Sequence, residues 1–352
     1  MSKIGYRVSG IVNYKKILIV RLDKIGDVVL STPVIKALRD AYPKSRISFL
    51  TGPNCRQILE GNPYLDEVII YDKKERERGI IGNLKFISRL RKIKFDLAVI
   101  LHPTNRSHLI AFLAGIPERV GYDKKMGILL TKNIPHLKQL GLKHEVDYTL
   151  DILRHIGIEP KERRLYMPIN DDSELRVSDI FAKCGIKEDD LVIALNPGAS
   201  CPSKRWGPEN YIKVGNDLAG RYGARIVVIC GSLDKSLGDN VARFISARAI
   251  NLSGRTTVGD LASVLKRSRL LISNDSGPVH IACAVGTPVI AIFGRSDRGL
   301  SPERWGPTGA DDVALHKDVG CAVCLAHDCE IGFKCLKAIT VDEVLQAAAK
   351  IL

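Results

Sequence analysis

An aspartate follows closely on the first strongly apolar run of the chain. Residues 17–20 read ILIV, and RLDKIGDVVLSTP continues from Arg21 to Pro33. The run predicts a buried strand, and the residues after it predict a helix that starts near Gly26 and Asp27. A carboxylate beside a helix N-terminus is stabilised in its charged form, which suits both a helix cap and a general base. The residues alone leave both interpretations of Asp27 open.

A second candidate site is the loop NPGASCPSKRWGPENY at residues 196–211. Small residues, among them Gly198 and Ser200, allow backbone amides to approach an anion, and Lys204 adds positive charge on the same loop. Pro208 suits the first position of a helix. The alternative is an ordinary strand-to-helix loop in which the side chains of Lys204 and its neighbour Arg205 are simply exposed to solvent.

The third and most specific candidate is SNDSGPVHIACAVGTPVIAIFG at residues 273–294. A strand is predicted to end at Asn274 and Asp275, Ser276 and Gly277 form the turn, and Pro278 begins a helix. The free amides and the dipole of such a helix start favour a phosphate group. His280 on the first turn either donates a further hydrogen bond or is packed in the core.

The elements that carry these loops alternate between strand and helix, which predicts an α/β fold with parallel sheets. At 352 residues, two doubly wound domains are the simplest architecture. The segment 157–173, with two prolines, predicts a linker. Expected strands are 16–20, 46–50, 67–71, 96–101, 191–195, 225–230, 249–252, 270–273 and 288–293, and expected helices are 27–42, 146–156, one opened by Pro208, 235–246, 259–266 and 278–285.

The first loop holds one glycine, so the GxGxxG fingerprint of a dinucleotide site is absent and a classical dehydrogenase is disfavoured.

Thr257 and Asp260, three residues apart, approximate a capping box at the start of the helix expected over 259–266.

Charge is unevenly distributed between the two halves. The net charge is +14; residues 1–160 contain 28 Lys and Arg against 16 Asp and Glu, and residues 161–352 contain 25 against 23. The first half is expected to favour an anionic partner.

The composition and the start of the chain bear on location. Nine cysteines and an N-terminal stretch without the apolar core of a signal peptide favour a reducing cytoplasm. No apolar stretch approaches the roughly 20 residues that cross a bilayer.

A basic amphipathic segment, GIIGNLKFISRLRKIK, spans residues 79–94. Ile80, Leu84, Ile87 and Leu90 form an apolar stripe at helical spacing. One interpretation is a surface helix that packs on the sheet through this stripe and exposes a solvated basic face. The other is a helix that faces a membrane surface or phosphate groups. Nucleic acid is disfavoured, because no recognition motif accompanies the charge.

Four motifs in order, GDVVLSTPVIKAL, NPGAS with KRWGPENY, NLSGRTT and NDSGPVHIACAVGTPVIAIFG, resemble those of glycosyltransferase family 9, the ADP-heptose:lipopolysaccharide heptosyltransferases. The likeness covers residues 16–352. It implies the GT-B architecture of two Rossmann-like domains facing a central cleft. Residues 1–165 would bind the acceptor, and residues 166–352, with a cysteine-rich segment and a final helix, would bind the nucleotide sugar.

The resemblance also implies roles for individual residues. Asp27 matches the catalytic base and Lys204 the lysine that holds the diphosphate, in an inverting transfer of heptose to the lipopolysaccharide inner core. The protein would act on the cytoplasmic face of the inner membrane. No DxD pattern positioned to hold a metal is evident in the sequence, so no metal or other cofactor is expected to be required. The implied donor-binding residues are Gly198, Ser200, Gly231, Ser232, Asn251, Leu252, Asp275, Ser276, Gly277 and His280, and Gly26, Arg106 and Arg119 are assigned to the acceptor.

Four cysteines, Cys321, Cys324, Cys329 and Cys335, lie within fifteen residues near the end of the chain. They are candidates for a structural zinc site, with His327 as a substitute ligand, and an iron–sulfur cluster and free or redox-paired thiols are the alternatives.

Two alternatives to heptosyl transfer stay open, and a third is more remote. A glycosyltransferase of the same fold could use another donor or acceptor, because the phosphate site is better defined than the sugar pocket. A non-catalytic sugar-nucleotide-binding or lipid-binding protein would keep the fold without the chemistry. A UDP-sugar epimerase lacks support, since its acid and base pattern is not evident.

Overall fold

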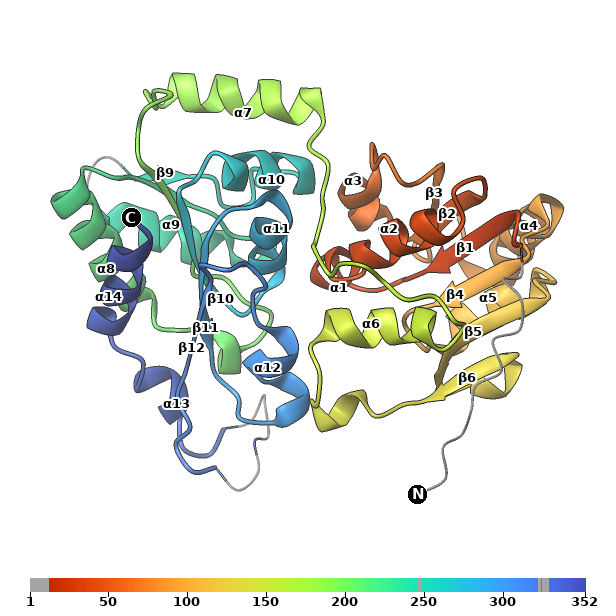
Figure 1. Ribbon diagram of the computed structural model, residues 1–352. Helices are drawn as coiled ribbons and strands as arrows, with labels where there is room; N and C mark the ends of the chain where they lie inside the picture. Colours follow the sequence, from red (N-terminus) through yellow and green to blue (C-terminus); the bar gives the residue numbers. More distant parts are fainter. Residues whose placement is uncertain (1–12, 246–248, 322–323, 325–328) are drawn as a thin grey trace. The chain divides into compact units, whose positions relative to one another are not determined.

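The computed structural model describes residues 13–245, 249–321, 324 and 329–352. Its contacts group the chain into two compact units, each built around one sheet (Figure 1). The N-terminal unit comprises 1–23, 31–136 and 146–163. The C-terminal unit comprises 164–352 and takes two short segments from the first half, 24–30 and 137–145.

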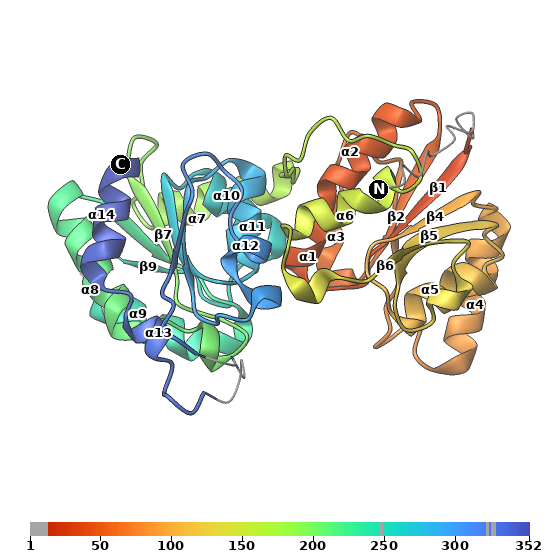
Figure 2. The ribbon, with the colours of Figure 1, turned by 60° about the horizontal axis from the view of Figure 1, so that its bottom comes forward.

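The N-terminal unit holds a six-stranded sheet in the order β3-β2-β1-β4-β5-β6, with every neighbouring pair parallel. Figure 2 shows α2, α3 and α6 on one face and α4 and α5 on the other. Its elements are β1 (Lys16–Val20), α2 (Thr32–Ala41), β2 (Arg46–Thr51), α3 (Arg56–Leu59), β3 (Glu67–Ile70), α4 (Gly79–Ile93), β4 (Leu97–Ile100), α5 (Asn105–Leu113), β5 (Glu118–Asp123), β6 (Lys132–Pro135) and α6 (Glu145–Arg154).

The C-terminal unit repeats this plan in the order β12-β11-β10-β7-β8-β9, again all parallel. Helices α8, α9 and α14 cover one face and α10 and α11 the other (Figure 2). Its elements are α1 (Ile25–Val29), α7 (Asp171–Lys183), β7 (Val192–Asn196), α8 (Pro208–Tyr222), β8 (Arg225–Val228), α9 (Lys235–Phe244), β9 (Ile250–Asn251), α10 (Val258–Lys266), β10 (Leu270–Asn274), α11 (Gly277–Val285), β11 (Val289–Phe293), α12 (Pro302–Trp305), β12 (Val313–His316), α13 (Lys334–Lys337) and α14 (Val341–Ile351), and short 3-10 turns include Lys138–Leu140, Pro202–Lys204 and Arg298–Leu300.

Both sheets follow the doubly wound plan, in which the strand order reverses once. The reversal lies between β1 and β4 in one unit and between β7 and β10 in the other. The loops after these strands diverge to opposite faces and leave a crevice at the carboxyl edge, where α/β proteins bind ligands. The predicted α/β fold with two doubly wound domains is therefore confirmed.

Several predicted elements need correction. The single helix expected over 27–42 is two helices, α1 and α2, because Pro33 lacks an amide hydrogen and its ring clashes with a continuing helix. The linker expected over 157–173 ends earlier, since Asn170 caps α7 by accepting from the Ser173 amide. Strands β5, β6 and β12 were not predicted.

The stripe predicted on α4 is buried only in part. Of the predicted residues, Leu90 packs in the core of the N-terminal unit beside Phe86, which the stripe did not include, whereas Ile80 and Leu84 are 79% and 57% exposed. The interpretation in which the whole stripe packs on the sheet is therefore wrong for the first half of this helix.

Candidate active site

The switch point of the C-terminal sheet brings two of the predicted loops together. Strand β7 leads into the 196–211 loop and β10 leads into the 273–294 segment, and the two strands are hydrogen-bonded neighbours with Asn196 opposite Ser273. Because parallel strands end at the same edge, both loops meet there. The two candidate anion sites are thus halves of one site.

Buried polar side chains fix these loops to each other. The Asn196 Nδ2 atom donates to Ser273 Oγ at 2.9 Å and to Ser276 Oγ at 2.8 Å. From the other strand, Asn274 Nδ2 donates to the Pro197 carbonyl at 2.7 Å, and Asn274 Oδ1 accepts from the Trp206 amide at 3.0 Å. Both asparagines are satisfied, so the network holds the site in one shape.

Two cations share one carboxylate at this edge. Asp275 Oδ2 lies 2.8 Å from Lys204 Nζ and 2.9 Å from Arg295 NH2. Asp275 is only 6% exposed at its side chain, and Arg295 is also buried. The three side chains carry a net positive charge, which suits the two phosphates of a nucleoside diphosphate.

Arg295 is a site residue that the sequence analysis missed. It follows β11 by two residues and so stands at the same edge as Asp275, since β10 and β11 are paired. Its φ of +53° lies in the left-handed region, which a non-glycine residue adopts at a cost that functional sites commonly carry. An arginine just after a predicted buried strand was the available signal.

Helix α11 starts within this site, with Ser276 as its N-cap and Gly277 as its first residue. Helix α1 packs against its first turn. A Cβ atom added at Gly26 would lie 2.8 Å from His280 Cδ2 and 3.4 Å from Gly277 Cα. Gly26, which was assigned to the acceptor, is needed here for the close approach of two helices.

Asp27 is the third residue of α1 and not its cap. The N-cap is Lys24, whose side chain makes no capping hydrogen bond, so the interpretation of Asp27 as an N-cap is wrong. Because α1 packs on the start of α11, the structure brings the backbone beside Asp27 to Gly277 and His280.

His280 is buried and neutral. Desolvation lowers its pKa to about 4, and Lys204 and His144 add to that shift while Asp275 and Glu145 oppose it. The Nδ1 atom is buried and has no hydrogen-bond partner within the described part of the chain. His280 is therefore packed beside the site as a neutral imidazole, and its hydrogen bond to a donor remains a prediction.

The other predicted donor residues follow the neighbouring strands of the same edge. Gly198 approaches Asp234 closely, because a Cβ there would lie 2.9 Å from Asp234 Oδ2. Asn251 at the end of β9 donates to Asp239 Oδ1 at 2.5 Å, and Leu252 is buried beside it. Ser200, Gly231 and Ser232 are exposed after β7 and β8. Their contact with a donor remains a prediction.

In the N-terminal unit, the switch point between β1 and β4 holds a pocket of about 960 Å³. Arg106, one of the residues assigned to the acceptor, lines it. Arg119 is not among the lining residues. Its guanidinium donates to the Leu129 carbonyl at 2.6 Å and stacks on Phe112. These contacts link β5 to α5 and to the turn that contains Leu129.

The four C-terminal cysteines are free thiols in the structure, and His327 lies outside the described residues. Among the residues that are described, no three His, Cys, Asp or Glu side chains converge to hold a metal ion. The metal assignment of Cys321, Cys324, Cys329 and Cys335 remains a prediction.

Comparison with known proteins agrees with this geometry. Residues 83–334, well over half of the chain, match the profile of glycosyltransferase family 9 (heptosyltransferase). The chain belongs to glycosyltransferase family 9. Lipopolysaccharide heptosyltransferase 3 of Escherichia coli strain K12 is 27% identical over 338 residues, which cover 93% of this chain and 95% of that protein.

Two solved structures share this fold. The family 9 glycosyltransferase of Veillonella parvula DSM 2008 superposes with a TM-score of 0.87 at 28% identity, over 97% of this chain and 98% of that one. The E. coli ADP-heptose lipopolysaccharide heptosyltransferase II superposes with a TM-score of 0.79 at 22% identity, over 96% and 98%. The GT-B fold class is confirmed. No helix in the described ranges is long and apolar enough to cross a membrane.

Proposed function

We propose that this protein transfers heptose from ADP-heptose to the inner core of lipopolysaccharide with inversion at the anomeric carbon. The observation that carries the proposal is the ion-pair cluster of Lys204 with the buried Asp275 and Arg295 at the switch point of the C-terminal sheet. The similarity to lipopolysaccharide heptosyltransferase 3 and to an ADP-heptose lipopolysaccharide heptosyltransferase supports this donor and this acceptor class.

In the proposed reaction, a carboxylate oxygen of Asp27 accepts the proton of an acceptor hydroxyl. The hydroxyl oxygen attacks the anomeric carbon and forms the new glycosidic bond. The bond from that carbon to the diphosphate breaks on the opposite face, and the electron pair leaves with ADP. A single displacement of this kind inverts the configuration.

Charge that develops on the leaving diphosphate needs stabilisation. Lys204 and Arg295 supply two cations, and the start of α11 adds amide groups and the helix dipole. In other glycosyltransferases a divalent metal ion stabilises this charge. Because Lys204, Arg295 and the start of α11 would stabilise it here, we propose a reaction that needs neither a metal nor another cofactor. Asp275 positions both cations while the donor is absent.

The N-terminal unit would bind the acceptor, and the C-terminal unit would bind the nucleotide sugar. We place the protein at the cytoplasmic face of the inner membrane, because the first half carries most of the positive charge and a lipopolysaccharide core is anionic.

A structural zinc at the four C-terminal cysteines is a separate proposal, and metal analysis of the purified protein tests it.

The first experiment is a calorimetric titration of ADP, UDP, GDP and CDP into the wild type and Lys204→Ala. We expect selective binding of ADP that Lys204→Ala weakens by tenfold or more, since a charge-assisted hydrogen bond contributes about 1.5–3 kcal/mol. Selective binding of UDP or GDP would exclude ADP-heptose as the donor, and a failure to bind any nucleotide would favour a non-catalytic protein.

A transfer assay with ADP-heptose and Asp27→Asn then tests the base. The variant keeps the size of the side chain but cannot accept the proton, so transfer should fall by about 10²–10⁴-fold while ADP affinity is retained. Asp40→Asn, an exposed change on α2, is the matched control. Unchanged transfer by Asp27→Asn would exclude the proposed base.

A further inference from the structure

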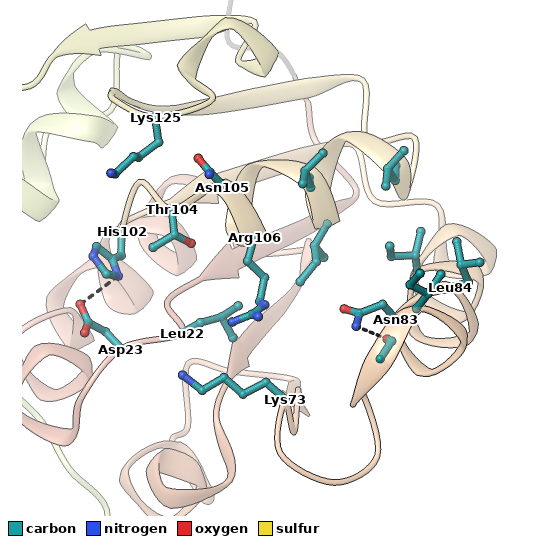
Figure 3. A pocket seen from close by; sticks show the side chains of 16 residues that line it. Leu22, Asp23, Lys73, Asn83, Leu84, His102, Thr104, Asn105, Arg106 and Lys125 are labelled. Carbon is teal, nitrogen blue, oxygen red and sulfur yellow. Dashed lines mark hydrogen bonds and ion pairs between the residues drawn. The ribbon is translucent and has the colours of Figure 1, made fainter.

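The pocket at the switch point of the N-terminal sheet has two chemically different ends (Figure 3). It lies beyond the carboxyl ends of β1 and β4 and between α4 and α5, entirely within one unit. Its volume of about 960 Å³ is at the upper end of the range typical of small-molecule sites, about 300–1,000 Å³.

One end is polar and basic. Lys73, Arg106 and Lys125 line it, and in Figure 3 Lys73 and Arg106 extend toward the same space. None of the three forms an ion pair within the described residues. The acidic side chain there, Asp23, is already paired with the buried Arg21 at 3.5 Å and lies 3.0 Å from His102 Nδ1. The polar end therefore carries uncompensated positive charge and suits an anion.

The other end is apolar. It is lined by side chains of α4 and α5, namely Ile80, Leu84, Ile87, Leu109, Ile110 and Leu113. Ile80, Leu84 and Leu113 are among the most exposed large apolar residues of this unit. An exposed apolar cluster of this kind beside a charged rim marks a binding surface.

We propose that this pocket binds an anionic amphiphile as a single molecule, with its acidic group at the basic end and its hydrocarbon chain along α4 and α5. The inference rests on the proposed function and deepens it, because the acceptor would then be recognised through its lipid anchor as well as its sugars. Charge complementarity selects the anion, and the contiguous apolar wall selects the chain.

The competing occupant of this surface is a bilayer, against which α4 would lie with its apolar side chains inserted. The pocket favours a single chain, because its apolar and basic residues converge on one concavity from α4, α5 and the strand ends. The membrane alternative predicts binding to vesicles without binding of a dissolved amphiphile, and that difference is measurable.

The test is a titration of the full-length protein with dodecyl phosphate and butyl phosphate, both below the concentration at which they form micelles. The two probes carry the same head group and differ in chain length. We expect dodecyl phosphate to bind at least about tenfold more tightly, because burial of each further methylene group is favourable. Dodecyl maltoside, which has the same chain and no charge, should bind more weakly than dodecyl phosphate.

Substitutions test which end of the pocket binds the hydrocarbon chain and which end binds the phosphate group. Ile80→Gln and Leu84→Gln should reduce the advantage of the long chain and leave butyl phosphate unaffected, and both residues are exposed enough for the fold to tolerate the change. Arg106→Gln should weaken both phosphates. Ile128→Gln, an exposed apolar position that does not line the pocket, and Lys92→Gln, an exposed cation of α4 outside it, are the controls.

Equal affinity for the two phosphates, or an equal loss in the Ile128→Gln control, would overturn the proposal. Binding to anionic phosphatidylglycerol vesicles without binding of dissolved dodecyl phosphate would overturn it in favour of membrane docking. ADP is titrated into every variant in parallel, so a failure of the donor site appears as a loss of ADP binding and is distinct from a failure of this pocket.

Discussion

Asp275 is held by two cations at once, and this shared carboxylate governs the effect of removing either one. When Lys204 or Arg295 is replaced, Asp275 keeps the other as its partner. No buried charge is then left without a counter-ion, so the fold should persist while the diphosphate site loses one positive charge.

We therefore predict that Arg295→Gln lowers ADP affinity by about tenfold or more, measured by calorimetry. Arg298→Gln is the matched control, because Arg298 is an exposed arginine three residues further on. ADP binding by Arg295→Gln equal to that of the wild type would show that Arg295 serves only to hold Asp275.

His280 predicts a pH dependence of stability. Burial lowers its pKa to about 4 in the folded protein, against about 6.5 in an unfolded chain. Between these values the unfolded state binds the proton more tightly, so stability falls as the pH drops from about 6.5 toward 4. The free energy of unfolding in urea should lose about 2 kcal/mol between pH 7 and pH 5 from this residue alone.

His280→Gln should remove that part of the slope. Its unfolding is compared with that of the wild type at both pH values, which subtracts the contribution of all other titrating groups. An unchanged difference between pH 7 and pH 5 in the variant would contradict the assignment.

At the scale of elements, the contact of α1 with α11 depends on the absence of a side chain at Gly26. We predict that Gly26→Ala destabilises the protein by about 1–3 kcal/mol in chemical denaturation, because a Cβ there would overlap the His280 ring. ADP affinity should fall as well, since the start of α11 would have to shift.

Gly220→Ala is the matched control for this prediction. Gly220 lies in α8 with nothing within 4 Å of an added Cβ, so alanine should stabilise the helix by about 0.5–1 kcal/mol. If both alanine variants were equally stable, the close approach of α1 and α11 would not limit the packing.

At the scale of the whole molecule, the C-terminal unit includes a segment from the first half of the chain. Glu145 pairs with Lys138 at 2.8 Å and with Arg304 at 2.8 Å, and all three side chains are largely buried. Gly141 in the same segment packs closely on Arg298. These contacts anchor residues 137–145 to the C-terminal unit, whose main part begins at residue 164.

Glu145→Ala should destabilise the protein by about 3–5 kcal/mol, because it leaves two buried cations without their carboxylate. Thermal or urea unfolding measures the loss, with Glu159→Ala at an 81% exposed position as the control. A loss below about 1 kcal/mol would show that the pair contributes no more than a surface salt bridge.

The sequence by itself determined what depends on neighbours along the chain. The alternation of strands and helices, the start of α8 at Pro208 and the capping box of Thr257 and Asp260 were predicted and are confirmed. The three candidate loops were also found, because strand ends, small residues and helix starts are local patterns. One local signal was not used: Pro33 separates α1 from α2, whereas a single helix over 27–42 was predicted.

Only the tertiary structure decided which of these loops meet. The pairing of β7 with β10 joins segments far apart in the chain, and together with the pairing of β10 and β11 it places Lys204, Asp275 and Arg295 in one cluster. Likewise, the exposure of Ile80 and Leu84 depends on where α5 and the strand ends lie, not on helical spacing. Hydrophobic burial and strand pairing are non-local, so no pattern within one segment could specify them.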